Sequence, residues 1–349
     1  MKLLKKSIKH CAIALAVAST AGIVTMPSAV AQNSEEAIKW RMQAHLPRGS
    51  GAWEDSLVAF KEEILDRTDG RLQIEVYPAD ALIPATEIFP AVKQGVIQMG
   101  YTSSGYLQSY IPTAGLAYTV PGAFDEVWEA AYFWKHLGFE DLIREEALEE
   151  GVYYFTEKLY PTEMVLKEPV GSLEDFSSLS LRSAGILQRF LTEVGASASY
   201  FSGTELYQAL STGVIDGAHW GASQEANSLS LYETAKYHVH PPLGIGGVEA
   251  FVINENAMES LPNNIQNTLK SVLEEHFWAR TNEYQFQEIE NLRNLEEEQG
   301  VTIIELPDDV QQKMKQVGRK IWDEEAKKSE NAAEAVRRLK DFLAVLGRG

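Results

Sequence analysis

One sequence module occurs twice in this chain of 349 residues, once in each half. ATEIFPAVKQGVIQMG spans residues 85–100 and GTELYQALSTGVIDGA spans residues 203–218, with matching positions 118 residues apart. Thr86 and Thr204 stand where a helix N-cap belongs, and a Gly-Val-Ile triplet follows as a helix stop and strand onset. A β-rich segment precedes each copy, and two copies are too few for a solenoid. The repeat therefore predicts two similar α/β lobes facing each other across a cleft, which suits a small ligand trapped by closure.

The first 31 residues have the composition of a secretory signal peptide. A basic stretch comes first, followed by an apolar run over residues 11–26 that small polar residues interrupt. Ala29-Val30-Ala31 then supplies the small-residue pattern of a cleavage site, so we expect the mature chain to begin near Gln32. A retained membrane anchor is the weaker alternative, because the apolar run is short and broken.

Removal of this peptide changes two properties of the chain. The single cysteine, Cys11, leaves with it, so the mature protein has no disulfide, no thiol nucleophile and no thiolate metal site. Four lysines also leave, which changes the formal charge from −19 to −23. A field of this sign opposes nucleic acid and anionic lipid as partners. It also opposes acidic ligands, so an acid-binding site in this chain needs a specific, buried cation.

Hydrophobic periodicity predicts strands and helices in alternation along the mature chain. The expected strands are 38–44, 72–76, 164–166, 179–183, 250–254 and 302–306. The expected helices are 53–64, 125–150, 186–194, 261–299 and 307–346. Residues 172–176 are expected to form a short turn. The alternation favours α/β lobes, and crossings near 151–160 and 241–247 make each lobe discontinuous and form a hinge.

No enzyme signature is present in the sequence. The GxSxG, HExxH, Walker and GxGxxG patterns are absent. Carboxylates are abundant, so composition does not exclude a pair of catalytic Glu residues like that of a glycosidase. No such pair stands out in the sequence. His238 and His240 have a metal-like spacing on a strand, and two ordinary histidines are the better interpretation because no further ligands lie nearby. We therefore predict no catalytic residue, no metal site and no cofactor.

Five residues at or after strand ends are candidates for ligand binding. Arg182 ends a strand on the face opposite its core leucines, and a guanidinium can hold a carboxylate through two parallel hydrogen bonds. His219 and Trp220 end the strand of the second repeat, and Tyr101 and Tyr106 follow the corresponding strand of the first. The alternatives are a salt-bridged surface arginine and a core tryptophan.

These residues lie in stretches that resemble the substrate-binding protein of a tripartite ATP-independent periplasmic (TRAP) transporter, of the dicarboxylate-binding DctP type. The matching stretches are WRMQ at 40–43, TDGRLQIEVYPADALIPATEIFPAVKQGVIQMGY at 68–101, SLED at 172–175, LR at 181–182, LSTGVIDGAHW at 210–220 and LYETAKYHVHPPL at 231–243. Together they cover nearly the whole mature chain in the right order. This combination is far more specific than any single match.

The resemblance implies a two-lobed α/β periplasmic binding protein with hinge strands and long C-terminal helices. It also implies capture of a small organic acid and delivery to a membrane permease driven by an ion gradient. In this family an Arg at the position of Arg182 pairs with the ligand carboxylate. The most similar branch binds short 2-oxo or 2-hydroxy acids, with a Tyr at the position of Tyr106 and a Glu-Trp pair at that of His219-Trp220.

In that branch the Glu of the Glu-Trp pair and a Gln help to hold a metal ion against the ligand carboxylate. This chain differs from the branch at both positions. Here His219 stands at the Glu position and Pro161 at the Gln position, so two hard oxygen ligands that sodium or calcium favours are missing. We therefore expect Arg182 and His219 to bind the carboxylate directly, with His219 as a pH-sensitive donor. Glu249 falls near another family pocket position and is a candidate acceptor for a hydroxyl or ammonium group, with ordinary solvation as the alternative.

The resemblance also sets the expected organisation and partners. Residues 32–157 and 246–285 are assigned to lobe 1, and residues 158–245 and 286–349 to lobe 2. The expected partners are a small organic acid and TRAP permease subunits, met in the periplasm. A homodimer is a further expectation, because some relatives pair through C-terminal helices. Two other functions stay open at this point: a secreted enzyme acting on a small carboxylate, and a ligand-loaded partner of a membrane sensor.

Overall fold

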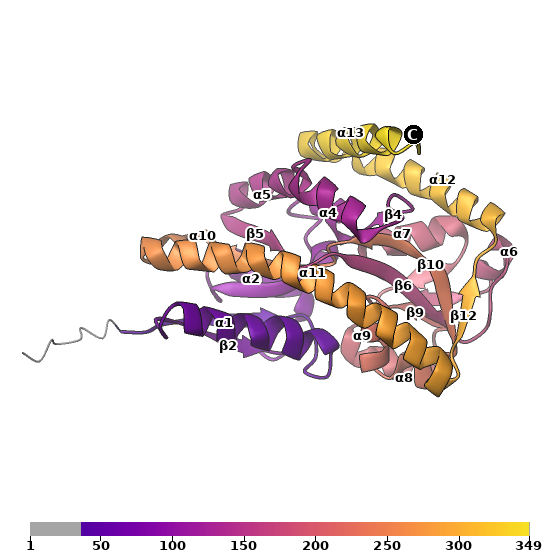
Figure 1. The fold of residues 1–349 in the computed structure, drawn as a ribbon, viewed down its shortest axis with the longest axis horizontal. Helices are drawn as coiled ribbons and strands as arrows, with labels where there is room; N and C mark the ends of the chain where they lie inside the picture. Colours follow the sequence, from indigo (N-terminus) through magenta and orange to yellow (C-terminus); the bar gives the residue numbers. More distant parts are fainter. Residues whose placement is uncertain (1–35, 349) are drawn as a thin grey trace, which may run out of the picture. The chain divides into compact units, whose positions relative to one another are not determined.

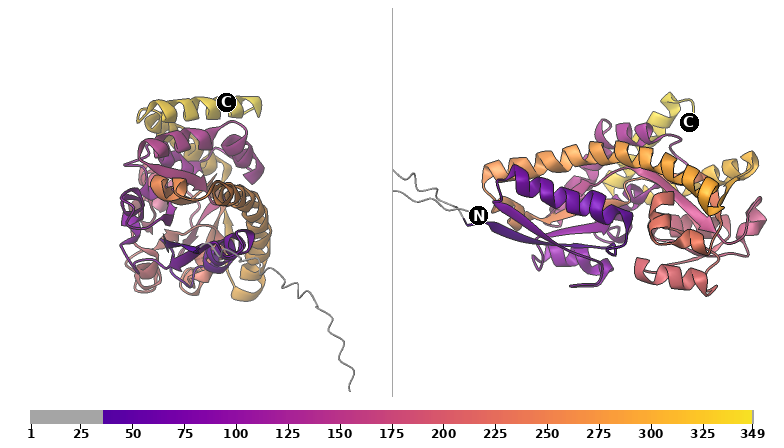
Figure 2. Two further views of the ribbon diagram at one scale, coloured as in Figure 1. Left: turned by 90° about the vertical axis from the view of Figure 1, so that its left-hand side faces the viewer. Right: turned by 60° about the horizontal axis from the view of Figure 1, so that its bottom comes forward.

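The computed structural model describes residues 36–348, and the chain from Ala37 onward makes up one compact unit. The predicted signal peptide, residues 1–31, lies outside the described residues. Two β-sheets with helices packed around them form this unit (Figures 1 and 2). None of the described helices is long and apolar enough to span a lipid bilayer. The α/β class predicted from the sequence is confirmed.

The first sheet has five strands in the order β2-β1-β3-β11-β5. Its strands are β1 (Ile38–Ala44), β2 (Leu72–Tyr77), β3 (Met99–Ser103), β5 (Val152–Thr156) and β11 (Glu249–Asn254). β1 runs parallel to β2 and β3, while β11 runs antiparallel to β3 and β5. In β1, buried Trp40 and Met42 alternate with exposed Lys39 and Arg41, which is why the period-two pattern located this strand.

The second sheet has the strand order β12-β10-β6-β9-β7-β8, and β4 pairs with β10 at one side. Its strands are β4 (Val120–Pro121), β6 (Tyr160–Leu166), β7 (Ser180–Arg182), β8 (Ser197–Ser199), β9 (Gly217–His219), β10 (Tyr237–Gly246) and β12 (Thr302–Glu305). β7 and β9 run parallel, so both end at the same edge of the sheet. β4 joins this sheet although its residues fall in the range assigned to lobe 1, and the lobe boundaries stay a prediction.

Helices cover both sheets, and the longest of them ties the two sheets together. They are η1 (Trp53–Val58), α1 (Ala59–Arg67), η2 (Ala85–Glu87), α2 (Ile88–Lys93), η3 (Ser104–Tyr106), α3 (Ala114–Tyr118), α4 (Val127–Lys135), α5 (Phe139–Glu149), α6 (Leu173–Phe176), α7 (Gly185–Val194), α8 (Gly203–Ser211), α9 (Ser223–Ser228), η4 (Leu231–Glu233), α10 (Glu255–Glu259), α11 (Asn263–Gln299), α12 (Asp308–Glu325) and α13 (Glu330–Val345). α11 contacts α1 and β5 at the first sheet and α9 and β6 at the second, and Figure 1 shows it crossing both.

The repeated module forms a short helix followed by a strand in both copies, as predicted. Gly95 and Gly213 end the two helices with φ of 70° and 76°, a left-handed conformation that glycine adopts without strain. The N-cap prediction is wrong, because the side chain of Thr86 makes no cap and the N-cap of the second helix is Ser202 rather than Thr204. The strand onset is also later than predicted, at Met99 and Gly217 rather than at the Val-Ile pairs.

Three other expected elements have different bounds in the structure. The helix expected over 125–150 is divided into α4 and α5 by Gly138, which has a φ of 71°. The helix expected over 307–346 is divided into α12 and α13, and the Ser329 hydroxyl accepts a hydrogen bond from the Ala332 N–H at the start of α13. The turn expected at 172–176 is the one-turn helix α6, which a Ser172–Asp175 capping box begins. In each case a local cap or a left-handed glycine decides the boundary.

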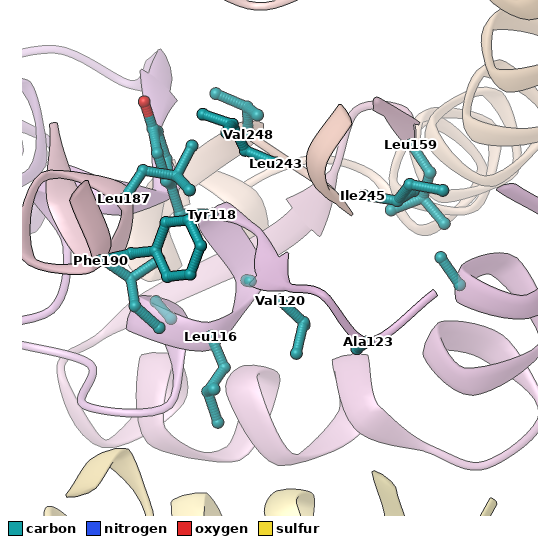
Figure 3. Close-up of a cluster of buried hydrophobic side chains, with 14 of the residues drawn as sticks. Leu116, Tyr118, Val120, Ala123, Leu159, Leu187, Phe190, Leu243, Ile245 and Val248 are labelled. Atoms are coloured by element: carbon teal, nitrogen blue, oxygen red, sulfur yellow. The ribbon is translucent and has the colours of Figure 1, made fainter. Parts of the chain in front are cut away.

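Apolar packing fixes the segment made of α3 and β4 against the second half of the molecule. Figure 3 shows Leu187 and Phe190 of α7 beside Tyr118 at the end of α3, with Leu243 and Val248 nearby. All five side chains are buried. This packing limits the directions in which the Tyr118 ring can point, and thereby places its hydroxyl group.

A pair of buried carboxyl groups anchors α11 to the second sheet. Glu288 of α11 accepts hydrogen bonds from the backbone N–H groups of Ser223 and Gln224 at 3.0 and 3.2 Å. Glu163 of β6 accepts from the same Ser223 N–H at 2.9 Å. Burial raises the pKa of Glu163 to about 7, and burial together with the neighbouring Glu163 raises the pKa of Glu288 to about 8. This anchor therefore holds protons near neutral pH.

We expect the free energy of unfolding to fall as pH rises from about 6.5 to about 8.5, because these native carboxyls retain protons that the unfolded chain has already lost. One carboxyl shifted from 4.5 to about 7 corresponds to about 3 kcal/mol over the whole interval from pH 4.5 to 7, so only the last part of this loss falls above pH 6.5. Below pH 6.5, buried His45, His219 and His238 oppose the trend, because burial lowers their pKa values. In thermal melts, Glu288→Gln should flatten the slope of Tm against pH, and the exposed-site control Glu283→Gln should not. Equal slopes for wild type and Glu288→Gln would contradict this account.

Candidate functional site

A small cavity receives side chains from both sheets. Its volume is about 20 Å³, which is room for about one water molecule. Its lining residues are His45, Leu46, Ser103, Tyr106, Tyr118, Arg182, His219, Trp220, Gly221, Glu225, Val248 and Glu249. A ligand of several atoms therefore enters only after parts of this lining move apart.

Strand ends deliver most of these polar side chains to the cavity. His45 directly follows β1 and Ser103 ends β3, while Glu249 begins the antiparallel neighbour β11. Arg182 ends β7 and His219 ends the parallel strand β9. In α/β folds the carboxyl ends of parallel strands form the edge where ligands bind, and here such edges of two sheets meet.

The guanidinium of Arg182 is buried and held in place from several sides. Its Nε donates to the Phe201 carbonyl at 3.0 Å, and its Nη1 donates to the His219 carbonyl at 2.6 Å. Its Cζ lies 4.7 Å from the centre of the Trp220 ring and 5.7 Å from that of Tyr200. Only 2 % of the residue is exposed, and no carboxylate pairs with it among the described residues. A fixed, desolvated guanidinium with N–H groups left over is suited to bind an anion.

His219 lies beside Arg182 as a neutral imidazole. Its Nδ1 is 3.3 Å from the Tyr118 hydroxyl, while its Nε2 is buried and has no hydrogen-bond partner among the described residues. Burial, with a further effect from the Arg182 charge, lowers the pKa of His219 to about 3. The expectation of a donor that titrates near neutral pH is therefore wrong for the free protein, because a second cation beside Arg182 is unfavourable there.

The predicted aromatic residues take different positions. The Tyr106 hydroxyl lies 3.2 Å from the Tyr200 hydroxyl and lines the cavity with Trp220. Tyr101 does not line the cavity: its ring stacks behind His45, with centroids 5.9 Å apart, and its hydroxyl donates to Glu157 at 3.3 Å. Tyr101 therefore contacts the site through His45 rather than directly.

Glu249 belongs to a buried charge network at the floor of the cavity. Its two oxygens lie 2.9 and 2.8 Å from the Tyr160 hydroxyl, and one lies 3.6 Å from the ammonium of Lys158. Lys158 in turn donates to Glu157 at 2.6 Å. Burial, opposed by Lys158, raises the pKa of Glu249 to about 7. Solvation, the alternative considered for Glu249, does not apply to a side chain this deeply buried.

Four polar lining residues, His45, Ser103, Tyr118 and Glu225, were absent from the sequence prediction. Ser103 ends β3, whose bounds the sequence did not predict. His45 follows a correctly predicted strand, so the strand-end rule applied to Arg182 would also have found it. Tyr118 lies in a segment with no periodic signal, and its packing against α7 brings it to the cavity. Glu225 lies on the short helix α9, where nothing in the sequence distinguishes it from other acidic residues.

The residues at the two family metal positions do not fit a sodium or calcium ion. His219 offers one imidazole nitrogen, and Pro161 offers no side-chain donor and does not line this cavity. Within residues 36–348, no group of three or more His, Cys, Asp or Glu side chains is arranged to hold a metal ion. The donor set therefore favours binding through Arg182 rather than through a cation.

Glu225 joins the two halves of the molecule beside the cavity. It lies on α9, next to the second sheet, and its oxygens accept hydrogen bonds from the Ser50 hydroxyl at 2.7 Å and the Ala52 N–H at 3.1 Å. Both donors belong to the segment that leads from β1 of the first sheet into η1. These two bonds exist only while the halves are in contact, so Glu225 acts as a latch for the closed form.

The sequence matches the family described as bacterial extracellular solute-binding protein, family 7, over residues 44–329. One relative, a monocarboxylate 2-oxoacid-binding periplasmic protein of Nostoc sp., is 24 % identical over 340 aligned residues, covering 93 % of this chain and 89 % of its own. A solved TRAP transporter solute-binding protein from Bordetella bronchiseptica, with calcium and picolinate, gives a TM-score of 0.81 at 20 % identity and covers 90 % of this chain and 94 % of that one. Another, from Pseudoalteromonas atlantica with sodium and pyruvate, gives 0.80 at 22 %, covering 89 % and 95 %. At these identities the structural likeness establishes the two-lobed fold.

Proposed function

The chain belongs to bacterial extracellular solute-binding protein family 7, and on this premise we propose that it captures a small organic acid for a TRAP-type permease. Members of this family serve transport and are not enzymes. The observation that supports an acid as ligand is the buried guanidinium of Arg182, which lies in a cavity between two sheets of a strongly acidic protein. Binding an anion against the formal charge of −23 expected for the mature chain requires such a local cation.

In this proposal the ligand carboxylate accepts hydrogen bonds from the remaining N–H groups of Arg182, and neutral His219 donates a further one through its Nε2, which has no partner among the described residues. Trp220 and Tyr106 pack against the apolar part of the acid, and Tyr101 supports His45 from behind. Closure of the two lobes then removes water from the site and strengthens the ion pair.

The proposed ligand is a short monocarboxylate, with 2-oxo and 2-hydroxy acids as the leading class. A cavity this small needs to widen least for a ligand of few atoms. The relative in Nostoc sp. is a monocarboxylate 2-oxoacid-binding protein, and the Pseudoalteromonas atlantica structure holds pyruvate. The solved structures from Bordetella bronchiseptica and Pseudoalteromonas atlantica contain calcium and sodium, respectively. In the binding mode proposed here, Arg182 rather than a metal ion is the main charge partner of the ligand carboxylate.

Ser50→Ala is expected to weaken binding of the acid about tenfold or more, although Ser50 does not line the cavity. The variant removes a hydrogen bond to the Glu225 carboxylate that exists only in the closed form, so fewer molecules are closed at a given ligand concentration. Calorimetric titration measures the effect. Ser56→Ala is the matched control, because Ser56 is also a buried serine near this segment but its hydroxyl has no partner among the described residues. Unchanged affinity in Ser50→Ala would argue against the latch.

We further propose that the protein works in the periplasm, with the TRAP permease subunits as its membrane partners. The predicted signal peptide and the family support this location. A homodimer stays a prediction. Exposed apolar side chains on α4, α11 and α13 offer a surface for it, namely Trp128, Tyr132, Trp278, Phe286, Ile289 and Val345. Sedimentation equilibrium of the mature protein measures that oligomeric state.

A thermal-shift screen of residues 32–349 against small mono- and dicarboxylates, with and without Ca²⁺, tests the proposed function. An acid present at ~1,000 times its Kd should stabilise the protein by about 4 kcal/mol, a shift of several degrees in Tm. We expect at least one acid to act without added Ca²⁺. If no acid shifts Tm while sugars or amines do, the proposed ligand class is wrong.

A further inference from the structure

The side of the cavity that belongs to the first sheet carries polar groups that capture of a carboxylate leaves unused. Glu249 begins β11 and His45 follows β1, whereas Arg182 comes from β7 of the second sheet. Both Glu249 and His45 are more than nine-tenths buried, with 6 % and 7 % of their surfaces exposed. Polar groups this deep are normally hydrogen-bonded, so their partners need to be accounted for.

Glu249 has acceptor capacity that the protein does not fill. A carboxylate offers about four lone-pair sites, and the only donor within hydrogen-bond distance among the described residues is the Tyr160 hydroxyl. The Lys158 ammonium at 3.6 Å and the His45 Nε2 at 3.8 Å are both too far for good hydrogen bonds. Neither ring nitrogen of His45 has a hydrogen-bond partner among the described residues.

The second carboxylate of the cavity, Glu225, has a separate protein donor on each of its oxygens. Its two oxygens accept from the Ser50 hydroxyl and the Ala52 N–H, which bind it to the first half of the molecule. Glu225 is therefore already occupied in holding the closed form. Glu249, with a single donor, is the less occupied of the two carboxylates in this cavity and the one that does not hold the halves together.

Resting on the proposed acid capture, we propose that the site selects acids that carry a hydroxyl or N–H group next to the carboxylate, and that Glu249 accepts the hydrogen bond from this group. The ligand carboxylate binds Arg182 on the second sheet and the donor group binds Glu249, beside His45, on the first. A 2-oxo acid presents a carbonyl oxygen to the same carboxylate, where two acceptors face each other. A 2-hydroxy acid of equal size presents a donor instead.

This arrangement also links ligand choice to closure. A bifunctional acid contacts both sheets at once, so its donor group stabilises the closed form. An acid without the donor group stays bound mainly to the second sheet and leaves Glu249 buried without a new partner. Sites built to pair with a ligand hydroxyl discriminate strongly against analogues that lack it, because their buried polar groups are left unpaired.

The test compares matched acid pairs by calorimetric titration of the mature protein, residues 32–349, in EDTA. The pairs are lactate with pyruvate and the corresponding 2-hydroxy and 2-oxo acids of four and five carbons. Burial raises the pKa of Glu249 to about 7, so the titrations are made at about pH 8, where its carboxyl is ionised. We expect the 2-hydroxy member of the best-bound pair to have a Kd at least about 30-fold lower.

Glu249→Gln should reduce that ratio to within about threefold, because the amide can donate to a 2-oxo group as well as accept. Glu288→Gln, which alters a buried carboxyl outside this cavity, should preserve the ratio. Equal or tighter binding of the 2-oxo acids by the wild-type protein overturns the donor selection and leaves the capture of acids standing. Binding of no acid at all overturns the proposed function itself. If Glu249→Gln does not fold, the wild-type ratio alone decides.

Discussion

Replacing Arg182 by alanine is expected to raise the Kd for the acid by about 100-fold or more. Truncating one partner of a buried, hydrogen-bonded charge pair costs about 2–5 kcal/mol, since the other charge stays buried and unpaired. Here the ligand carboxylate would remain in a cavity lined by Glu225 and Glu249, with no cation in direct contact. Calorimetric titration of the best acid from the screen measures this loss.

Two further variants separate binding from folding. Arg182 also donates to the carbonyls of Phe201 and His219, so the alanine variant loses structural hydrogen bonds as well. Arg182→Lys keeps the charge but loses the planar fork, and an intermediate affinity is expected. Arg189→Ala removes a partly buried arginine of the same half that lies outside the cavity, and it should bind the acid normally. Undiminished affinity in a folded Arg182→Ala protein would contradict the role given to this residue.

Lys158→Met is expected to lower the free energy of unfolding by about 3–5 kcal/mol and Tm by about 10 °C. The Lys158 ammonium is almost fully buried between the Glu157 and Glu249 carboxylates, 2.6 and 3.6 Å away, and above the ring of Tyr160. Burial alone would raise the pKa of Glu157, but Lys158, with help from His276, holds it well below its usual range. Without Lys158 both carboxylates lose their main compensating charge.

The destabilisation by Lys158→Met should grow between about pH 5 and pH 8. Without the ammonium, the pKa values of Glu157 and Glu249 rise in the native state, so protonation relieves the loss at low pH and ionisation restores it at high pH. Lys93→Met removes a solvent-exposed ion pair with Glu150 and should cost less than about 1 kcal/mol. A Lys158→Met protein that melts within about 2 °C of the wild type would show that the buried network contributes little.

The fold was largely predictable because strong local patterns coincide with its main elements. The alternation around Trp40 predicted β1 at its observed bounds, and the helix expected over 261–299 corresponds to α11. The errors fall where a single residue decides a boundary. Gly138 divides the helix expected over 125–150, and Ser202 rather than Thr204 caps α8. These helix boundaries depend on left-handed backbone conformations and on cap geometry. The spacing of apolar residues predicts neither.

The site was predictable where a strand end and a chemically suited side chain coincide. Arg182 and His219 follow this rule, and the structure brings both to one cavity with Trp220, Tyr106 and Glu249. Their roles in binding stay predictions. Tyr101 was expected to follow the strand of the first repeat, but it lies inside β3, and its ring lies behind His45. The apolar pattern placed the start and end of this strand too early.

Three features of the site depend on tertiary contacts that sequence spacing does not contain. Tyr118 reaches the cavity because α3 packs against α7. Glu225 becomes a latch because α9 meets the segment after β1. The neutral state of His219 results from burial beside Arg182, whereas its position in the sequence suggested a titrating donor.

Small-angle X-ray scattering of the mature protein, with and without the best-bound acid, tests the central claim most directly. Capture on Arg182 by closure of two lobes predicts that saturating acid decreases the radius of gyration of the wild-type protein. The same acid concentration should leave Arg182→Ala unchanged. If the wild-type protein binds the acid with no change in its radius of gyration, or if Arg182→Ala contracts as the wild type does, the account is contradicted.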